Sequence, residues 1–232
     1  MGKWSFEESS GNAVDTSGYK TDGTVNTTGV ERVPDCGIGL GGCFEFDGDN
    51  GYVEIPSIEV ESVTVSVWAY NNEEWGENRR EIVTGNSTYG TNLVLRGDER
   101  PQWGKGRAIW HWSSDTVGGW HALATEPLRS KSWYNLVGVY DKQEGVLRFY
   151  LNGAGVQTYI KNGSIMPGQG SPVSSDIKSE SAETRIGRHP GFAGNYWNGY
   201  LDEVQIYKSA LLSSQIQQLY AQGLIKRYLA YK

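Results

Sequence analysis

The segment NYWNGYLDEVQIYKSALLSSQIQQLYAQG, residues 195–223, decides the fold class because it places a strand signal directly before a helix signal. Residues 199–207 are mostly apolar and begin at a glycine, which is typical of a strand. An acidic pair, Asp202 and Glu203, interrupts this strand. Because neighbours on a strand point to opposite faces, we expect that the two carboxylates cannot act on one bond from the same side.

The helix signal lies in SSQIQQLYAQG. Three apolar residues recur there at helical spacing: Ile216, Leu219 and Tyr220. Ser214 and Gln217 fit a capping box, and Gly223 stands where a helix commonly ends. We therefore predict one short helix near the C-terminus. Residues 224–232 form a tail beyond it, either a further short strand or a peptide lying against the domain.

Strand signals recur along the rest of the chain. VTVSVWAY alternates, so that Val63, Val65, Val67 and Ala69 face one way. The composition of 31 Gly, 9 Trp and 14 Tyr suits many short strands joined by tight turns. No internal linker or repeat divides the sequence. It predicts one all-β domain over residues 1–232, an antiparallel sandwich.

The charge pattern excludes two classes of partner. The net charge is −6, and no basic run is longer than Arg79–Arg80. Nucleic acid and anionic membranes both favour a concentrated positive face, so neither is expected. No apolar stretch approaches the roughly 18 residues of a membrane span, and no signal peptide is visible. We expect residues 1–2 to be an added start, with any export segment removed.

Two cysteines, Cys36 and Cys43, flank the glycine-rich segment GIGLGG. Their spacing is compatible with a disulfide, although free thiols are the alternative. Zinc is not expected here, because it favours four ligands and no histidine lies nearby in sequence. A disulfide would indicate an oxidising compartment.

Several phrases together resemble the laminin-G-like jelly-roll domains of the concanavalin A-like lectin and glucanase superfamily. They occur in order over most of residues 4–222: WSFEESSGNAVDTSGY, CFEFDGDNGYVEIP, VTVSVWAY, SWYNLVGVYDKQEGVLRFYLNG, RIGR and WNGYLDEVQIYKSALLSSQIQQLY. The resemblance implies a jelly-roll sandwich of two antiparallel sheets. It also implies a structural calcium ion and a carbohydrate-binding role on a secreted or surface protein, including pilin-like heads.

An enzyme is the less favoured alternative. Glycosidases of this superfamily carry a pattern like Glu-x-Asp-x-x-Glu, and paired carboxylates are required for that chemistry. Here Glu45 and Asp47 match, but Asn50 replaces the last carboxylate. No lyase phrase, nucleophile elbow or phosphate loop is present. We therefore expect no catalytic residues.

Calcium would need oxygen ligands from carboxylates and turns. The loop AVDTSGYKTDGT offers Asp15 and Asp22, and the closing strand offers Asp202. Related jelly rolls place the first and last strands side by side, so these aspartates could share one ion. The alternative is that Asp15 and Asp22 form turns and that Asp202 is satisfied by backbone N–H groups.

Sugar recognition uses flat aromatic faces and a few fixed polar groups. One candidate place is an unusually aromatic stretch, residues 100–127, which carries Trp103, Trp110, Trp112 and Trp120, and a second is the loop GRHPGFAGNYWNG. The candidate ligand contacts from both places are Trp103, His111, Trp120, Arg188, His189, Tyr196 and Trp197. For Trp103, Trp120 and Trp197 anchoring of a loop is an equal alternative. Trp110 and Trp112 share one strand face and belong to either core or site, whereas Trp4, Trp68 and Trp133 are expected in the core.

The sequence thus predicts a non-catalytic binding or adhesion module, located outside the cell or on its surface. Its expected partner is a carbohydrate or a cell-surface glycoconjugate. One alternative is an adhesive head on a surface filament that binds protein. A second is a glycan-active enzyme of the same superfamily.

Overall fold

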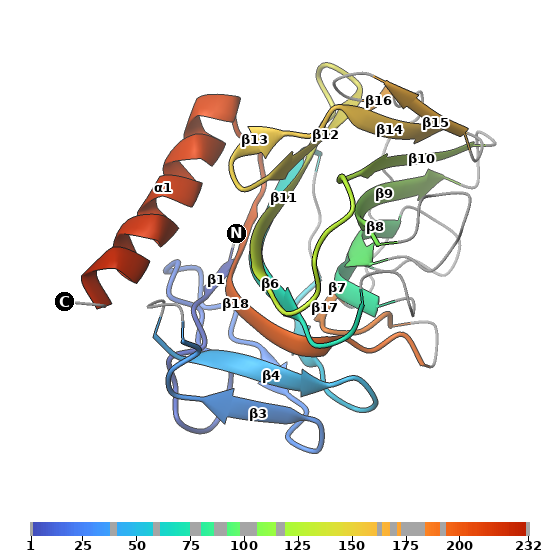
Figure 1. Ribbon diagram of the computed structural model, residues 1–232. Coiled ribbons are helices and arrows are strands. Elements are labelled where there is room, and N and C mark those ends of the chain that lie inside the picture. The colour runs from blue at the N-terminus through green and yellow to red at the C-terminus, as the bar shows by residue number, and fades with distance from the viewer. Residues whose placement is uncertain are drawn as a thin grey trace.

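Two antiparallel β-sheets face each other and enclose the core (Figure 1). This computed structural model describes residues 2–37, 41–57, 61–74, 80–85, 92–97, 106–114, 119–161, 164–167, 171–172, 184–190 and 194–230. Helix α1 (Ser213–Ala230) lies on the outer side of one sheet. The predicted jelly-roll sandwich with one helix near the C-terminus is therefore confirmed.

The sheet that carries α1 is called sheet 1. Its strand order is β13 (Ala154–Gly155), β12 (Val146–Leu151), β11 (Trp133–Asp141), β6 (Val63–Asn71), β18 (Asn198–Tyr207), β4 (Cys43–Asp47) and β3 (Val30–Val33). Two further strands pair with this path: β1 (Gly2–Trp4) with β18, and β16 (Ser171–Pro172) with β12. The first strand therefore lies beside the last one, as the resemblance implied.

The opposite sheet is called sheet 2. Its strand order is β15 (Ser164–Pro167), β14 (Thr158–Lys161), β10 (Gly119–Ala124), β9 (Ala108–Ser114), β8 (Asn92–Gly97), β7 (Arg80–Gly85), β17 (Thr184–Ile186), β5 (Val53–Ile55) and β2 (Thr24–Val25). The described strand pairings of both sheets are antiparallel, and several join strands that are close in sequence. Strands far apart in the sequence also pair: β18 with β1, β4 and β6, β17 with β5 and β7, and β11 with β6. These pairings tie the C-terminal part to the N-terminal part.

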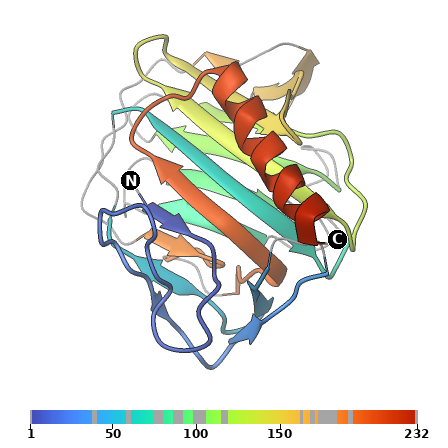
Figure 2. The ribbon, with the colours of Figure 1, turned by 90° about the vertical axis from the view of Figure 1, so that its left-hand side faces the viewer.

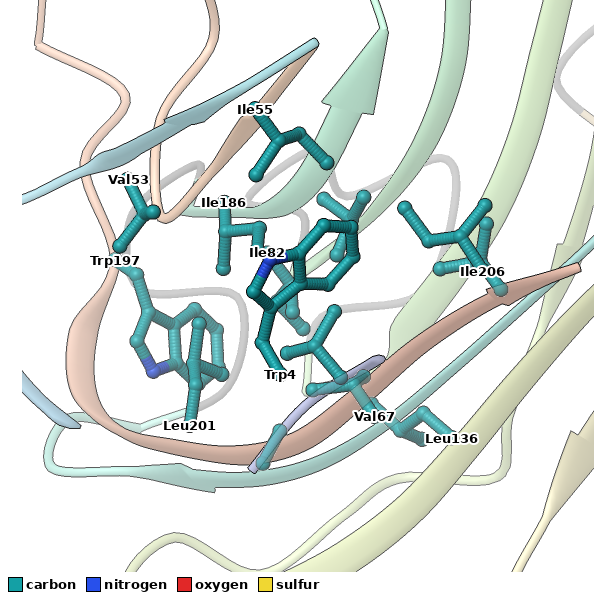
Figure 3. Close-up of a cluster of buried hydrophobic side chains, with 14 of the residues drawn as sticks. Trp4, Val53, Ile55, Val67, Ile82, Leu136, Ile186, Trp197, Leu201 and Ile206 are labelled. Carbon is teal, nitrogen blue, oxygen red and sulfur yellow. The ribbon is translucent and has the colours of Figure 1, made fainter. Parts of the chain in front are cut away.

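The core lies between the two sheets and follows the period of two expected for strands. On β6 the four residues predicted to face one way, Val63, Val65, Val67 and Ala69, are all buried in it. Figure 3 shows Trp4 and Trp197 in this cluster, among side chains from both sheets such as Ile186 and Leu201. Trp4 is therefore a core residue, as predicted, and so is Trp110 on β9.

The other two tryptophans expected in the core lie on the outer face of sheet 1. Trp68 is buried beneath α1, where its ring stacks on Tyr220 with centroids 5.7 Å apart. Trp133 is half-buried, so its assignment to the core was wrong. The alternation of side chains along a strand explains the position of Trp68, because its neighbours Val67 and Ala69 face the core.

Helix α1 is longer than predicted, lies over the outer face of sheet 1 and runs obliquely along its strands (Figure 2). It spans 18 residues and continues through Gly223 to Ala230, so the predicted end at Gly223 and the separate tail 224–232 are corrected. A Cβ atom on Gly223 would lie 2.9 Å from Nε1 of Trp68. The glycine therefore allows the helix to approach the sheet closely, and it does not end the helix.

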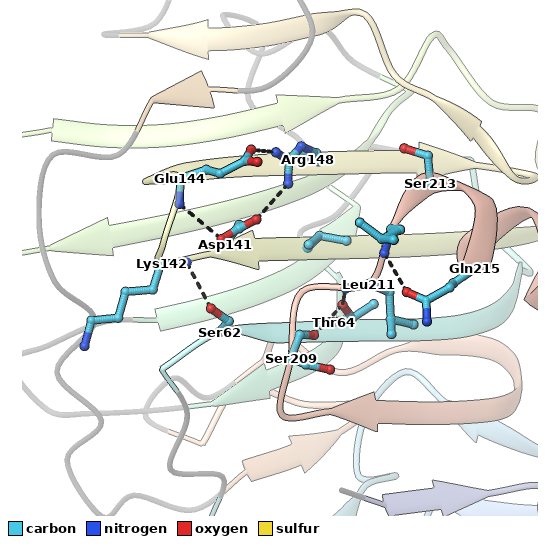
Figure 4. A network of polar contacts seen from close by, with 12 residues as sticks. Ser62, Thr64, Asp141, Lys142, Glu144, Arg148, Ser209, Leu211, Ser213 and Gln215 are labelled. Atoms are coloured by element: carbon cyan, nitrogen blue, oxygen red, sulfur yellow. Dashed lines mark hydrogen bonds and ion pairs between the residues drawn. The ribbon is translucent and has the colours of Figure 1, made fainter.

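Hydrogen bonds fix the start of the helix to the sheet. The hydroxyl of Thr64 donates to the carbonyl of Ser209 (2.8 Å) and accepts from the backbone N–H of Leu211 (3.0 Å), as Figure 4 shows. The backbone N–H of Leu212 donates to the side chain of Gln215 (2.9 Å). Gln215 thus fills the capping role, and the observed pair of Leu212 and Gln215 lies two residues before the predicted pair of Ser214 and Gln217.

Cys36 and Cys43 form a disulfide, with their Cα atoms 6.0 Å apart. Cys43 is buried at the start of β4. The bond closes the loop that precedes this strand, and the prediction of a pair is confirmed.

Candidate functional site

The aromatic loop before β18 has a buried end. Trp197 has no exposed surface and lies in the core, and its backbone N–H donates to the carbonyl of Gly187 (2.7 Å). A ring without an exposed face cannot stack on a sugar. The structure therefore corrects the prediction of Trp197 as a ligand contact and supports the alternative, in which it anchors the loop.

The two predicted histidines are buried as well. His111 on β9 and His189 after β17 are each 1% exposed. Neither imidazole reaches the surface, so neither can touch a ligand in this conformation. The prediction of His111 and His189 as ligand contacts is therefore corrected, because both side chains are buried, as Trp197 is.

Two predicted tryptophans are not placed. Trp103 lies outside the described residues. The backbone of Trp120 belongs to β10 and pairs with Ser113 on β9, but its side chain is not among those that the structure describes. Both stay predictions.

The structure brings the remaining predicted contacts, Arg188 and Tyr196, together on the surface. Their backbones form a β-bridge that closes the loop between them. The Cζ atom of Arg188 lies 4.8 Å from the ring centroid of Tyr196 and 5.3 Å from that of Tyr52. Cζ of Arg185 lies 4.8 Å from the Tyr52 ring. These four half-buried residues are called the arginine–tyrosine stack.

Tyr52 and Arg185 were not predicted as site residues, although the sequence holds a signal for them. In GYVEIP and TRIGR the apolar residues Val53 and Ile186 are buried and their neighbours alternate with them. Period-two alternation therefore places Tyr52 and Arg185 on the outer face. What the sequence could not provide is the pairing of β17 with β5, which brings the two segments together.

The two arginines of the stack differ in their electrostatic partners. Arg185 forms an ion pair with Glu54 on the neighbouring strand, with 3.3 Å between Nη2 and Oε2. The guanidinium of Arg188 has no hydrogen bond or ion pair with any residue in the part of the chain that the structure describes, and its Nε is buried. Buried polar groups nearly always have a hydrogen-bond partner, so this guanidinium is an exception.

Arg80 holds the loop of the stack in place. Its Nη1 donates to the carbonyl of Tyr196 (2.9 Å) and to the carbonyl of Gly48 (2.8 Å). The other side of the guanidinium binds Glu73 through two contacts of 2.6 and 3.0 Å. Because this bidentate pair fixes the guanidinium plane, Arg80 positions Tyr196 without being part of the surface stack.

A second surface cluster lies on the outer face of sheet 1. One row of directly paired residues crosses five strands of this sheet and is called the aromatic row: Trp133, Tyr70, Tyr200, Glu45 and Glu31. The ring centroids of Tyr70 lie 5.6 Å from Trp133 and 5.3 Å from Tyr200. All three rings are half-buried. Sequence reasoning missed this row because its members come from five separate segments.

The acidic end of the aromatic row changes the chemistry of Tyr200. Burial, followed by the hydrogen bond and the charge of Glu45, raises the pKa of Tyr200. An open depression of ≈ 790 Å³ borders this end and is lined in part by Glu31, Glu45 and Asn198. The row therefore joins apolar rings to hydrogen-bond acceptors on one continuous surface.

The predicted calcium ligands are occupied by protein donors. Oδ1 of Asp15 accepts from the backbone N–H groups of Lys3 (2.9 Å) and Ser17 (2.8 Å), and Oδ2 accepts twice from Thr21 (2.9 and 2.6 Å). Burial alone would raise the pKa of Asp15, but these hydrogen bonds hold it well below its usual range. Asp22 accepts from the backbone N–H of Asp15 (2.8 Å). These hydrogen bonds occupy carboxylate oxygens that a calcium ion would need as ligands.

Asp202 lies apart from that loop. Asp15 is bridged to Trp4, and Trp4 pairs with Val204 on its other side, so β1 separates the loop from β18. Over the described ranges, no group of three or more His, Cys, Asp or Glu side chains is arranged to hold a metal ion. The three aspartates therefore do not fit one shared calcium ion, and calcium stays a prediction of the sequence.

A β-bulge overturns the expectation for the acidic pair. The register of β18 against β6 shifts between Asp202 and Gln205, and Glu203 has a positive φ of 46°. Leu201 and Val204 both face the core, so the extra residue leaves Asp202 and Glu203 together on the outer side beneath α1. Glu203 pairs there with Lys3 and Lys226.

Asp202 has no such pair of its own. It is fully buried, Oδ1 accepts from the backbone N–H of Glu203 (2.6 Å), and Oδ2 has no partner among the residues that the structure places. Burial, together with the adjacent charge of Glu203, raises the pKa of Asp202 well above its usual value.

The segment that partly matches the glycosidase pattern forms a turn. Oδ1 of Asp47 accepts from the backbone N–H groups of Asp49, Asn50 and Gly51 at 2.8–3.0 Å. Burial opposes them, but these hydrogen bonds lower the pKa of Asp47. The carboxylate therefore shapes the turn before β5.

Two facing antiparallel sheets with this topology define a jelly roll of the lectin-like class. A family model described as the concanavalin A-like lectin/glucanases superfamily matches residues 47–217, and the chain belongs to this family. A search of curated proteins finds no match. Where the structure describes the chain, no helix is long and apolar enough to cross a membrane.

Solved structures share the fold at low identity. Domain 4 of AbnA, a GH43 extracellular arabinanase from Geobacillus stearothermophilus, in complex with arabinotriose, is 18% identical with a TM-score of 0.71; the match covers 94% of this chain and 97% of that one. The binding domain of Paraclostridial Mosquitocidal Protein 1 is 16% identical, with a TM-score of 0.68 and coverage of 95% and 51%.

A third structure is the ligand-binding domain of botulinum neurotoxin serotype D in complex with N-acetylneuraminic acid. It is 16% identical, with a TM-score of 0.68, and the match covers 96% of this chain and 50% of that one. The chain thus spans about half the length of the two toxin domains. At these identities the likeness concerns the fold.

Proposed function

We propose that this chain is a non-catalytic carbohydrate-binding module of an extracellular or cell-surface protein. The observation that carries the proposal is the arginine–tyrosine stack, in which two half-buried tyrosines lie beside a guanidinium with unused donors. Aromatic faces and a few fixed polar groups are the elements with which proteins recognise sugars. The stack provides both on one face of the molecule.

Three further observations support the proposal. The chain belongs to a lectin and glucanase superfamily. Solved structures with the same fold carry an arabinotriose and an N-acetylneuraminic acid. The Cys36–Cys43 disulfide suits an oxidising compartment, in keeping with a location outside the cell. The proposal needs no calcium, because the contacts of the stack come from the protein alone.

The test is a glycan array followed by calorimetry on the glycans that bind. We expect Tyr196→Ala and Tyr52→Ala each to weaken binding about three- to tenfold, as the loss of an aromatic contact does. Tyr19→Ala is the matched control, since Tyr19 is a tyrosine that is 64% exposed in the N-terminal loop. It should bind like the wild type.

Two outcomes would contradict the proposal. If the folded wild-type protein retains no glycan, the carbohydrate-binding function is wrong. If glycans bind and the Tyr52→Ala/Tyr196→Ala double variant binds them equally well, the site lies elsewhere.

A second candidate function is adhesion to a protein partner, as a head of a surface assembly. The aromatic row favours it, because three half-buried rings beside two carboxylates resemble the aromatic and polar mixture of protein interfaces. Self-association is the first form to check, by sedimentation of the wild type and of Trp133→Ala. A concentration-dependent dimer that the substitution abolishes would support this function, and a monomer that binds glycans would oppose it.

A further inference from the structure

We infer that the arginine–tyrosine stack selects glycans that carry an anionic group, a carboxylate or a sulfate ester, and that Arg188 binds this group. The inference rests on the proposed carbohydrate-binding function and names the class of ligand that the site prefers. It depends on the geometry of the Arg188 guanidinium and on the partners of the other arginines.

The two tyrosine rings restrict how Arg188 can be approached. The rings of Tyr52 and Tyr196 both lie within 5.3 Å of its Cζ. A guanidinium stacked on aromatic rings keeps its N–H groups in its own plane, pointing outward from the stack. The free direction is therefore the edge, where the donors match two oxygens of a carboxylate or sulfate.

Among the residues that the structure describes, none provides an anion for these donors. Four other arginines are neutralised by carboxylates within the chain: Arg185 by Glu54, Arg80 by Glu73, Arg148 by Asp141 and Glu144, and Arg107 by Glu126. The guanidinium of Arg188 lacks a hydrogen bond or ion pair anywhere in the described ranges, and its Nε is buried. Arg188 thus combines the two tyrosine contacts with the lack of an ion pair to a described carboxylate.

The neighbouring ion pair keeps the positive charge of the stack on Arg188. Arg185 lies on the same tyrosine, but Glu54 neutralises it at 3.3 Å. A ligand with one anionic group would therefore meet one uncompensated cation, held on a ring whose position is fixed by the strand pairing of β5 and β17. Charge-assisted hydrogen bonds of this kind are stronger than neutral ones, so the anion should decide the preference.

The experiment compares three versions of one oligosaccharide by calorimetry. These are a uronic-acid oligosaccharide, its carboxyl-reduced neutral form, and an O-sulfated neutral form. We expect the wild type to bind at least one anionic form about tenfold or more tightly than the neutral form. Binding of the uronate alone, of the sulfate alone, or of both would identify the source of the anion, and each supports the inference.

Variants at Arg188 test the residue. In Arg188→Gln the anionic and neutral forms should bind within about twofold of each other, because the charge is lost. Arg188→Lys keeps the charge but loses the planar donor fork and should lose most of the preference. Arg129→Gln is the control for net charge, since Arg129 is an exposed arginine, and it should keep the wild-type preference. If Arg188→Gln does not fold, the lysine variant decides.

The outcomes separate the two proposals. Equal binding of all three forms by the wild type overturns the preference for anions and leaves the carbohydrate-binding function standing. A preference that persists in both Arg188 variants overturns the role of Arg188. Absence of binding to every form, together with a silent glycan array, overturns both proposals.

Discussion

The indole of Trp110 on sheet 2 lies directly against the backbone of Gly138 on sheet 1. A Cβ atom on Gly138 would lie 2.2 Å from Cδ2 of Trp110, and the indole N–H donates to the carbonyl of Val139 (3.1 Å). The two sheets are therefore joined here by a side chain on one and bare backbone on the other. This contact sets how closely the layers approach each other at the centre of the core.

Substitution of Gly138 should separate the sheets locally. We expect Gly138→Ala to lower the free energy of unfolding by about 1–3 kcal/mol, because overpacking forces the tryptophan or the strand to move. Chemical denaturation measures the effect. Gly155→Ala is the control, since its Cβ would make only an ordinary contact at 3.8 Å. Equal effects of the two substitutions would contradict the close approach.

Loss of Arg80 should weaken both the fold and the site. Arg80→Ala removes the contacts with Glu73, Gly48 and Tyr196, and we expect a loss of about 2–4 kcal/mol of stability. A double-mutant cycle with Glu73→Gln checks the pair and should give a coupling energy of about 1 kcal/mol or more. Because Arg80 holds the backbone of Tyr196, glycan binding should also weaken in the folded variant. Additive stability effects would show that the two side chains act independently.

Replacement of Asp202 should change how stability depends on pH. The pKa of Asp202 is raised in the folded protein, so the folded state holds a proton that the unfolded state has lost above its usual pKa near 3.8. Stability from this group therefore falls as the pH rises from the unfolded pKa to the folded one. Asp202→Asn keeps an acceptor for the Glu203 N–H and removes the ionisation.

We expect Asp202→Asn to be more stable than the wild type by about 1 kcal/mol or more near pH 8, with a smaller difference near pH 4. Urea unfolding across this range measures the difference. Glu203→Gln is the contrasting variant, because it removes a carboxylate that pairs with Lys3 and Lys226, and it should be less stable. A difference for Asp202→Asn that does not grow with pH would contradict the buried, unpaired carboxylate.

Removal of calcium tests the prediction made from the N-terminal loop. Since Asp15 is already bonded to Lys3, Ser17 and Thr21, we expect a strong chelator to leave the melting temperature within about 1 °C. Asp15→Ala should lower stability by about 2 kcal/mol or more with and without calcium. A drop of several degrees on chelation, restored by added calcium, would instead establish a structural ion.

The lowered pKa of Asp15 also predicts how the stability of the fold changes in acid. The pKa of Asp15 is lowered in the folded protein, so its contribution is present above the unfolded pKa of about 3.8 and is lost as the pH falls below that value. Asp15→Asn should therefore flatten the loss of stability in acid. The slope of stability against pH below 4 provides the check.

The fold could be predicted from sequence because strand signals are local. The alternation on β6 placed Val63 and Val67 in the core correctly, and the first and last strands pair as the resemblance implied. The bulge at Glu203 could not be predicted, since one extra residue breaks the period of two without any mark in the composition. The predicted helix end at Gly223 was wrong for a similar reason, because a glycine in a helix can either end it or allow a close contact with a neighbouring element.

The site was harder to predict, because exposure depends on contacts between distant segments. The glycines around Trp197 suggested an open loop, yet its bond to Gly187 places the ring inside the core. Arg188 and Tyr196 were predicted as ligand contacts from one loop and lie side by side in the structure, whereas Tyr52 joins them only through the pairing of β5 with β17. Candidate residues within one segment could therefore be predicted from the sequence, but their contacts with residues on other strands could not.

Side chains of the first strand and of the last helix meet at one residue. Lys3 on β1 and Lys226 near the end of α1 pair with the same carboxylate, Glu203. One carboxylate therefore holds both β1 and α1 against β18. A change that removed either lysine would leave Glu203 with a single cationic partner beside the buried Asp202.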